Sequence, residues 1–357
     1  MTLGQIIGAA LMLLFLADIF LTVLYARAGA GLLAPYWSRA VWALLYGAAK
    51  LFGGRRGTVL SLAGPTIVVS LIGLWALGLT IGAALIIGPE LGAAIRPSSG
   101  DASTDFVTAL MVAGNSLSIV GSGDYSPHTA GTRVLFLINS LIGASVLSLV
   151  LSYLVQVYTA LRERNALALS IHLMTDGTGD AARMLARLLP EGDSSHAVSE
   201  LGNLARSLAA TKEAHHFYPL LFYFRFEEPY YAVSRFSFVV LDLTTLLETA
   251  LDRQRYGTLI SSASATSLRQ GALLLLQTLD RDFPSASDHG DDAAAEARRH
   301  TQSYVAAIDT LARSGVAVQT AGMERYLAAR REWEPLTRHI APTLGYTMNE
   351  IDERQPG

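Results

Sequence analysis

The sequence predicts an all-α protein whose first part lies in a membrane and whose second part is a helical domain outside it. Three observations lead to this fold class. Apolar residues make up 51% of the 357 residues and are crowded into the first part of the chain. Several apolar runs there reach the roughly 20 residues that a membrane-spanning helix needs. From Asn165 onward the composition is that of a soluble domain, with apolar residues at helical spacing and no alternation of strand and helix patterns.

Composition excludes several classes of function. The net charge of −3 is too small to steer nucleic acid, so no nucleic-acid partner is expected. The chain has no cysteine, which excludes disulfides, thiolate chemistry and sulfur-ligated metal sites. No Ser-His-Asp, Walker or paired-carboxylate arrangement stands out in the sequence. We therefore expect no enzyme, no catalytic residues, no metal and no cofactor.

Residues 1–28 are expected to form a first transmembrane helix. The apolar run Leu3–Ala26 is long enough to span, and it lacks the positive segment with which a cleavable signal peptide begins. Asp18 interrupts the run, and an acid at that depth is costly. Asp18 is either part of an ion pathway or gate, or a buried acid hydrogen-bonded to a neighbouring helix. The second interpretation is favoured.

Residues 35–57 are expected to form an interfacial helix and a cytoplasmic link, with membrane lipid as a partner. The stretch Pro35–Gly53 is aromatic and apolar but short for a span, and Trp and Tyr prefer the membrane interface. Whether residues 36–53 span the membrane or lie on it stays open. The basic residues of this part of the chain, with no acid among them, are Arg27, Arg39, Lys50, Arg55 and Arg56. The positive-inside rule therefore predicts a cytoplasmic segment and an N-terminus outside.

Two further apolar segments, Thr58–Gly88 and Thr129–Tyr158, are expected to cross outward and back, and Pro65 can kink the first. Between them a turn-rich loop, Pro89–Gly100, precedes a short helix that ends near Leu117. The candidate N-caps of this short helix are Asp101, Ser103 and Thr104. A half-helix that ends at a glycine-rich loop predicts a re-entrant segment, because non-helical backbone at membrane depth must be buried in protein or line a watery path.

A short motif follows the half-helix. It reads Ser118-Ile119-Val120-Gly121-Ser122-Gly123-Asp124. Pointing successive carbonyl groups the same way needs backbone angles that glycine adopts without steric cost, and Gly121 and Gly123 supply them. The motif resembles the pore loop of the potassium-channel superfamily, whose filter usually reads Thr-Val-Gly-Tyr-Gly-Asp. The alternative interpretation is a Gly-Ser loop between two membrane helices.

The resemblance covers about Thr58–Arg162. It implies a pore domain over residues 58–162, made of an outer helix, a re-entrant pore helix, a filter loop and an inner helix, in a prokaryotic channel of the bacterial plasma membrane. Residues 118–124 are then the ion filter, and the permeating ions are monovalent cations, with K⁺ favoured. Because such a filter is built from four loops of backbone carbonyls, a chain with one loop implies a homotetramer.

Two filter positions depart from the family pattern. Ile119 stands where the family usually has Thr, whose hydroxyl adds an oxygen ligand, and Ser122 stands where it usually has Tyr or Phe, which packs against the pore helix. The pore-helix positions that face Ser122 are Met111 and Val112, where the family usually has Trp. We therefore expect weakened potassium selectivity. The alternatives are a non-selective or divalent-permeable channel on the same scaffold, a membrane-anchored sensor or scaffold with a vestigial pore, and a membrane-anchored cytoplasmic enzyme.

Gly143 has two interpretations. It follows Asp124 by 19 positions, which is about where the channels that this sequence resembles carry the hinge glycine of the inner helix. It is either a gating hinge or a glycine that permits close helix packing, and both interpretations stay open.

Residues 163–357 are expected to form a helical cytoplasmic domain that controls gating, because it follows the inner helix directly. The expected helices are Ala181–Leu189, Ala197–Ala210, Ser234–Arg253, Ser267–Asp280, Ala293–Ala312 and Gly322–His339. A polar linker is expected over Ser285–Asp292. The sequence leaves room for an unidentified cytoplasmic ligand of this domain.

Two stretches of this domain carry functional alternatives. Asp176–Ala182 contains the dinucleotide-type pattern G-x-G-x-x-A, with Leu169–Met174 as its candidate strand. No second strand that ends in an acid follows, so a loop that breaks a helix is favoured. The candidate metal ligands are His215, His216, Glu227 and Glu228. For these an aromatic core with a solvated acidic turn is favoured.

Overall fold

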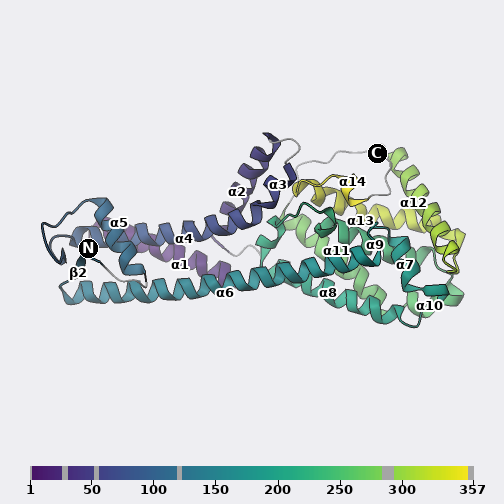
Figure 1. The fold of residues 1–357 in the computed structure, drawn as a ribbon, viewed down its shortest axis with the longest axis horizontal. Coiled ribbons are helices and arrows are strands. Elements are labelled where there is room, and N and C mark those ends of the chain that lie inside the picture. The colour runs from purple at the N-terminus through teal and green to yellow at the C-terminus, as the bar shows by residue number, and fades with distance from the viewer. Residues whose placement is uncertain (1, 26–30, 52–55, 119–122, 284–292, 353–357) are drawn as a thin grey trace. The chain divides into compact units, whose positions relative to one another are not determined.

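The computed structural model describes residues 2–25, 31–51, 56–118, 123–283 and 293–352 (Figure 1). The chain divides into two compact units, and each is described by itself. The apolar unit comprises Met1–Leu44 and Pro65–Tyr158, and the C-terminal unit comprises Leu45–Gly64 and Thr159–Gly357. Most of the described residues are helical, which confirms the all-α fold class.

The apolar unit contains the long apolar helices. Its helical elements are α1 (Leu3–Ile19), the π-helical turn η1 (Phe20–Leu24), α2 (Ala34–Ala49), α4 (Ala63–Ile87), α5 (Phe106–Leu117) and α6 (Ala130–Met174). One end of each of α2, α4 and α6 belongs to the C-terminal unit. Among the described residues, three helical stretches are long and apolar enough to cross a membrane: Leu3–Leu24, Arg56–Glu90 and Ala130–Met174. They correspond to the three predicted spans. The 16-residue α2 is not one of them.

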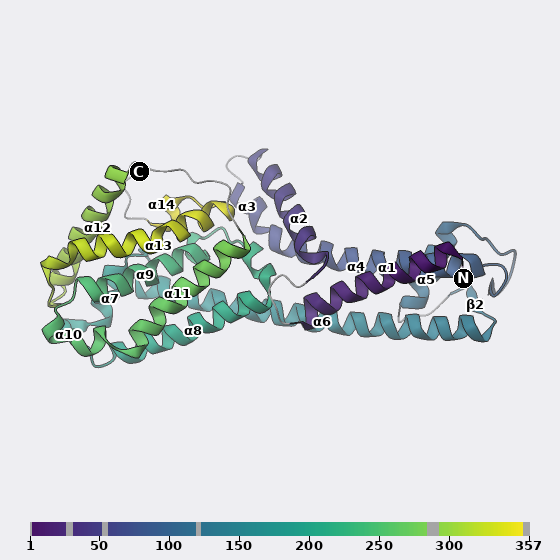
Figure 2. The same ribbon diagram turned by 180° about the vertical axis from the view of Figure 1, so that it is seen from behind.

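Helices α1 and α4 lie side by side, and glycines let their backbones approach closely (Figure 2). A Cβ atom at Gly8 would lie 2.5 Å from the carbonyl oxygen of Gly82, and one at Gly78 would collide with the ring of Phe15. In lipid, close packing of this kind holds helices together, because apolar surface gains little by leaving lipid for protein.

The helix that begins at Arg56 is interrupted before Pro65. Helix α3 (Arg56–Ser61) ends there, and α4 starts at Ala63. Pro65 has no N–H to donate to the carbonyl of Ser61, and its ring crowds that carbonyl. The kink that the sequence predicts at Pro65 is therefore a break one turn earlier.

The loop between α4 and α5 contains a short strand that the sequence did not predict. After the 3₁₀ turn η3 (Gly88–Glu90), strand β1 (Ile95–Pro97) pairs antiparallel with β2 (Tyr125–Pro127), with Arg96 opposite Ser126. Strands of three residues are too short to show an alternating pattern of apolar and polar residues, so they could not be recognised in the sequence.

The N-cap of α5 corrects the sequence prediction. Asp105 caps the helix, and its Oδ1 accepts a hydrogen bond of 2.9 Å from the backbone N–H of Thr108. Asp101, Ser103 and Thr104 were the predicted caps. Ser103 instead donates its hydroxyl to the Asp105 carboxylate, which holds the capping side chain in place. These hydrogen bonds, with that of Ser103 the strongest, hold the pKa of Asp105 below its ordinary value.

The C-terminal unit is a helical assembly. Its elements are α3, α7 (Ala181–Leu188), η4 (Pro190–Gly192), α8 (Ala197–Phe217), η5 (Pro219–Tyr223), η6 (Pro229–Tyr231), α9 (Val233–Thr249), α10 (Arg253–Ile260), α11 (Ala263–Asp282), α12 (Ala293–Arg313), η7 (Thr320–Gly322), α13 (Met323–Thr343) and α14 (Met348–Ile351). Every residue of α9 except Glu248 is buried. Helices α7, α11 and α13 pack on α9, which makes it the core of this unit (Figure 1).

Four predicted helix boundaries in this unit were wrong. The helix that begins at Ala197 continues to Phe217, and α9 ends at Thr249 because Asp252 caps a separate helix, α10. Helix α11 begins at Ala263 rather than Ser267, and α13 ends at Thr343 rather than His339. The candidate strand Leu169–Met174 is the last part of α6. The predicted linker over 285–292 lies outside the described residues.

Candidate ion filter and its surroundings

Helix α5 leads directly into the filter motif. It ends at Leu117, and Ser118 has extended backbone angles while its N–H still donates to the carbonyl of Gly114 at 2.9 Å. Ile119, Val120, Gly121 and Ser122 lie outside the described residues, so only the two flanks of the predicted filter can be placed. The carbonyl end of α5 points its partial negative charge toward the start of the motif, and this favours a cation there.

The last residue of the filter motif, Asp124, and the residue after it are held by the loop between α4 and α5. The carbonyl oxygen of Asp124 accepts hydrogen bonds from the backbone N–H of Ser98 at 2.7 Å and from its hydroxyl at 3.0 Å. The buried Tyr125 accepts a hydrogen bond from the N–H of Ser103 at 3.1 Å and donates to the Ser103 carbonyl at 3.3 Å. The pairing of β1 with β2 holds the same segment. The Asp124 side chain itself is exposed.

The flank that precedes the motif packs on α6. Asn139 of α6 donates its side-chain N–H to the hydroxyl of Ser116 at 2.9 Å, and both side chains are buried. Gly143 lies against the carbonyl of Leu117, and α6 passes Gly143 as a continuous helix. This contact supports the packing interpretation of Gly143, and a hinge role stays a prediction. Sequence reasoning missed Ser98, Tyr125 and Asn139, since their contacts join residues far apart in the chain.

Asp18 is the buried, hydrogen-bonded acid of the favoured interpretation. Its side chain is fully buried. One carboxylate oxygen accepts the backbone N–H groups of Leu33 at 2.7 Å and Ala34 at 3.3 Å, and the other accepts the indole N–H of Trp75 at 2.7 Å. Asp18 of α1 therefore caps the N-terminus of α2 and ties it to α4.

The glycine-rich stretch after α6 is a helix-ending loop. Gly177 and Gly179 have φ angles of 75° and 68°, which let the chain reverse before Asp180 caps α7. The guanidinium group of Arg235 would lie 2.8 Å from a Cβ at Gly179. The candidate strand before this stretch is helical, so the structure does not support the dinucleotide interpretation.

The four metal-ligand candidates of the aromatic stretch do not form a site in the part of the chain that the structure describes. Glu227 and Glu228 are exposed, and His216 is half-buried. His215 is buried, and neither of its ring nitrogens has a hydrogen-bond partner among the described residues. Burial, with a smaller contribution from the positive charge of Arg164, lowers the pKa of His215 to about 3.

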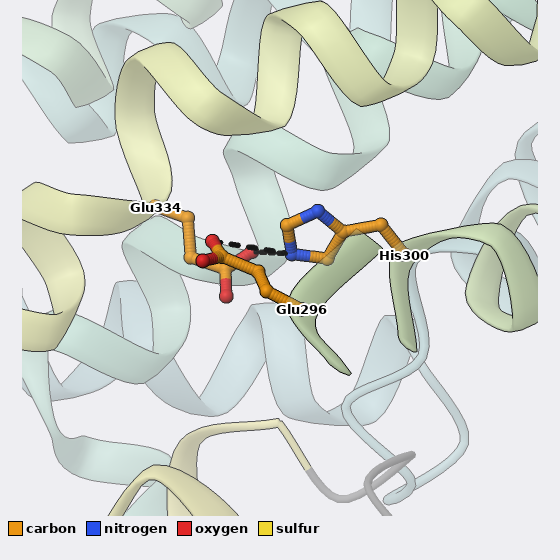
Figure 3. A group of neighbouring side chains, drawn as sticks. All are labelled: Glu296, His300 and Glu334. Atoms are coloured by element: carbon orange, nitrogen blue, oxygen red, sulfur yellow. Dashed lines mark ion pairs between the residues drawn. The ribbon is translucent and has the colours of Figure 1, made fainter. Parts of the chain in front are cut away.

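A different group of possible metal ligands does come together in the C-terminal unit. Figure 3 shows Glu296 and His300 of α12 facing Glu334 of α13. Nε2 of His300 lies 2.7 Å from a carboxylate oxygen of Glu334. The spacing of four residues between Glu296 and His300 was the one sequence signal, and Glu334 lies too far along the chain to be paired with them by pattern.

These three residues form an ion-pair cluster rather than a metal centre. Arg330 lies 2.8 Å from the Glu334 carboxylate, and Arg338 lies 2.9 Å from Glu334 and 3.3 Å from Glu296. A metal ion would have to displace or oppose both guanidinium groups. Burial disfavours the Glu334 carboxylate, yet the charge of Arg330, the hydrogen bond from His300 and the charge of Arg338 hold the pKa of Glu334 below its ordinary value.

Comparison with known protein families supports a channel. Residues 67–160 match the family described as ion channel, which is a two-transmembrane, potassium-channel-like family. The match runs from α4 through α5 and the filter motif into α6. It supports an ion channel of the potassium-channel-like type, and such a protein is not an enzyme. No curated protein and no solved structure matches this chain.

Proposed function

We propose that the protein is a homotetrameric cation channel of a bacterial plasma membrane, with weakened potassium selectivity and with gating controlled by a cytoplasmic C-terminal unit. The observation that carries the proposal is the family match over residues 67–160, together with a half-helix, α5, that ends at the filter motif. One motif per chain cannot enclose a path, so four chains are needed.

Cation flux tests this proposal directly. The purified protein is reconstituted into liposomes, and its oligomeric state is measured by mass in detergent. We expect tetramers that pass K⁺ and Na⁺ but exclude Cl⁻. Tetramers without flux would favour a membrane-anchored sensor or scaffold, and anion flux would contradict the proposed filter. Flux of Ca²⁺ would favour the divalent-permeable alternative.

Selectivity is tested by restoring the two departures from the family filter. A lost oxygen ligand is expected to cost about 1–3 kcal/mol, by analogy with an unmade hydrogen bond. Because about 1.4 kcal/mol corresponds to a tenfold change, this loss can remove much of the discrimination between K⁺ and Na⁺. The double change Ile119→Thr with Ser122→Tyr should move the reversal potential toward the potassium limit. A parent protein already at that limit would disprove the weakened selectivity.

The membrane orientation is tested with single cysteines, which the cysteine-free chain allows. A cysteine at Gly4 should react with an impermeant thiol reagent added outside, and a cysteine at Gly54 should not. The basic stretch between Arg27 and Arg56 supports this arrangement. Labelling of Gly54→Cys from outside would contradict it.

Control by the C-terminal unit is supported by the hydrogen bonds that Arg164 and Arg225 make around the loop of residues 219–226, which we call the clasp. Arg164 of α6 is 1% exposed and donates to the carbonyls of Leu221 at 2.8 Å and Phe224 at 3.0 Å. Arg225 of the same loop donates to the carbonyl of Gly57 in α3 at 3.0 Å. One loop thus holds both the chain that leads into α4 and the helix that leaves the matched segment, so a change in its packing can act on both.

The clasp is tested by Arg164→Met, with Arg162→Met as control because Arg162 is exposed two residues earlier on α6. We expect Arg164→Met tetramers to conduct with an altered open probability in planar bilayers, and Arg162→Met tetramers to behave as the parent. Truncation after Arg164 should alter open probability in the same assay. If neither Arg164→Met nor the truncation changes the open probability, control by this unit is contradicted.

A further inference from the structure

We propose that Asn139 and Gly143 of α6 form a seat that positions the filter from its pore-helix side. The inference rests on the proposed cation conduction and goes beyond it by naming residues that keep the filter in shape. The two residues of this seat contact the last two residues of α5, Ser116 and Leu117.

The first contact is a buried hydrogen bond. Asn139 is 1% exposed and Ser116 is 4% exposed, and the side-chain N–H of Asn139 lies 2.9 Å from the Ser116 hydroxyl oxygen. The Ser116 hydroxyl in turn donates a hydrogen bond to the carbonyl oxygen of Ala113 at 2.8 Å. The amide of Asn139 is thereby connected to the last turn of α5, two residues before the motif begins at Ser118. A buried hydrogen bond of this kind fixes both distance and rotation between the helices.

The donor of Asn139 is the group that matters. Its side-chain oxygen is buried and has no hydrogen-bond partner among the described residues. Burying an amide with an unpaired oxygen is unfavourable, and a leucine of similar volume would avoid that cost. The amide at position 139 therefore indicates that the directed hydrogen bond to Ser116 outweighs the cost of the unpaired oxygen.

The second contact is made one helical turn further on the same face of α6. The carbonyl oxygen of Leu117 occupies the place where a side chain at position 143 would begin, and its carbonyl carbon lies 2.7 Å from that place. Residues four apart share a face of a helix, so Asn139 and Gly143 act on consecutive residues of α5 together. Only glycine admits the backbone of α5 this closely.

The filter motif of this chain lacks the aromatic side chains that hold such a loop in place, so another restraint is required. In the channels that it resembles, aromatic side chains of the filter and the pore helix brace the loop, and here Ser122, Met111 and Val112 stand at those positions. Met111 is 48% exposed and Val112 is buried in the apolar core. The flank after the motif is fixed by Ser98, as described above. The seat supplies the matching restraint on the flank before the motif.

The test separates the seat from a gating hinge. A hinge at Gly143 predicts that Gly143→Ala changes open probability and leaves the K⁺/Na⁺ permeability ratio as in the parent. The seat predicts a changed ratio, because the added methyl group displaces the carbonyl of Leu117. Gly131→Ala is the matched control, since a Cβ at Gly131 of α6 meets nothing within 4 Å.

The hydrogen bond is tested by removing each partner. Asn139→Leu keeps the side-chain volume and removes the hydrogen-bond donor. Ser116→Ala removes the acceptor without adding an atom. Ser116→Ala therefore still tests the bond if Asn139→Leu fails to assemble. We expect each to change the K⁺/Na⁺ permeability ratio by about 2- to 10-fold, the equivalent of one hydrogen bond, and the double variant to add little. Ser140→Ala, at an exposed neighbouring position, should leave the ratio unchanged.

The outcomes are distinguishable from failure of the proposed function. A conducting parent whose ratio is the same in Asn139→Leu, Ser116→Ala and Gly143→Ala tetramers overturns the seat alone. A parent tetramer that passes no cation overturns the proposed function and the seat with it. An altered ratio in Gly131→Ala or Ser140→Ala as large as in the seat variants also overturns the seat, because the effect would not be specific.

Discussion

The two units bury charge in different ways. In the apolar unit the carboxylate of Asp18 is met by neutral donors, the indole of Trp75 and two backbone N–H groups at the start of α2. In the C-terminal unit the guanidinium group of Arg330 is met by charges. It lies 2.8 Å from Glu334 and 3.3 Å from Asp352.

The difference follows from the cost of a second charge in an apolar surrounding. A counter-cation beside Asp18 would have to be placed at membrane depth, where every ionisable side chain is expensive. The free N–H groups and the dipole of a helix N-terminus compensate a carboxylate without another ion. In the C-terminal unit, ion pairs can form because surrounding helices supply further partners. Arg330 also lies over the rings of Phe238 and Trp333, at 4.9 and 5.3 Å.

The largest effect is expected from breaking the ion-pair cluster. Arg330→Met leaves the buried carboxylates of Glu334 and Asp352 without their common partner, and removing one member of a buried pair costs about 3–5 kcal/mol. Denaturant unfolding of the full-length protein in detergent measures this loss for the C-terminal unit. Arg331→Met is the control, because Arg331 is exposed and its loss should change stability by less than about 0.5 kcal/mol. Equal effects of the two substitutions would mean that the cluster contributes no special stability.

A smaller loss is expected at Asp18, where the partners are neutral. Asp18→Leu leaves the indole N–H of Trp75 and the N-terminus of α2 unpaired, at about 2–3 kcal/mol in total. Asp18→Asn keeps one acceptor oxygen and should lose about half as much. Thermal unfolding of the full-length protein in detergent ranks the three proteins. An Asn variant as unstable as the Leu variant would show that the negative charge, rather than the hydrogen bonds, is what the structure requires.

His215 extends the comparison, because it is buried in the C-terminal unit with neither a counter-charge nor a hydrogen-bond partner among the described residues. Its pKa is lowered to about 3 by burial and by Arg164, against an ordinary value of about 6.5. The unfolded chain therefore binds a proton on acidification before the folded chain does. The stabilising effect of neutral His215 is complete above pH 6.5 and is lost as the pH falls toward 3, at about 1.4 kcal/mol per pH unit.

The measurement is the pH dependence of unfolding of the full-length protein in detergent. His215→Leu should flatten the loss of stability below pH 6.5, whereas the same change at the half-buried neighbour His216 should not. A slope that persists in His215→Leu would assign the acid sensitivity to other groups.

The smallest effect is expected at an exposed cap. Asp105→Ala removes the N-cap of α5 and should destabilise the apolar unit by about 1 kcal/mol. Asp101→Ala, at a cap position that the sequence favoured and the structure did not use, should change stability by less than about 0.5 kcal/mol. Thermal unfolding of both variants compares them. The reverse ranking would mean that the helix begins earlier than Asp105.

Local patterns were sufficient for much of the apolar unit. The three helical stretches that are long and apolar enough to span a membrane were predicted from the length of apolar runs, since a bilayer sets that length directly. The end of α5 at Leu117 follows from the glycine-rich motif after it. The resemblance of that motif to a potassium-channel filter led to the same class of protein that the match over residues 67–160 supports. The seven filter residues themselves remain predictions.

Other features of the candidate site were decided only by the tertiary structure. Asp105 was not among the predicted caps of α5, and only the path of the loop placed its carboxylate beside Thr108. The hydrogen bond of Asn139 to Ser116 joins positions 23 residues apart, and Asp18 meets Trp75 across 57. A sequence pattern records which side chains share a face of one helix. The helix that faces them depends on packing the whole unit, so the partners of Asp18, Asn139 and Gly143 exist only once α1, α4, α5 and α6 are in place.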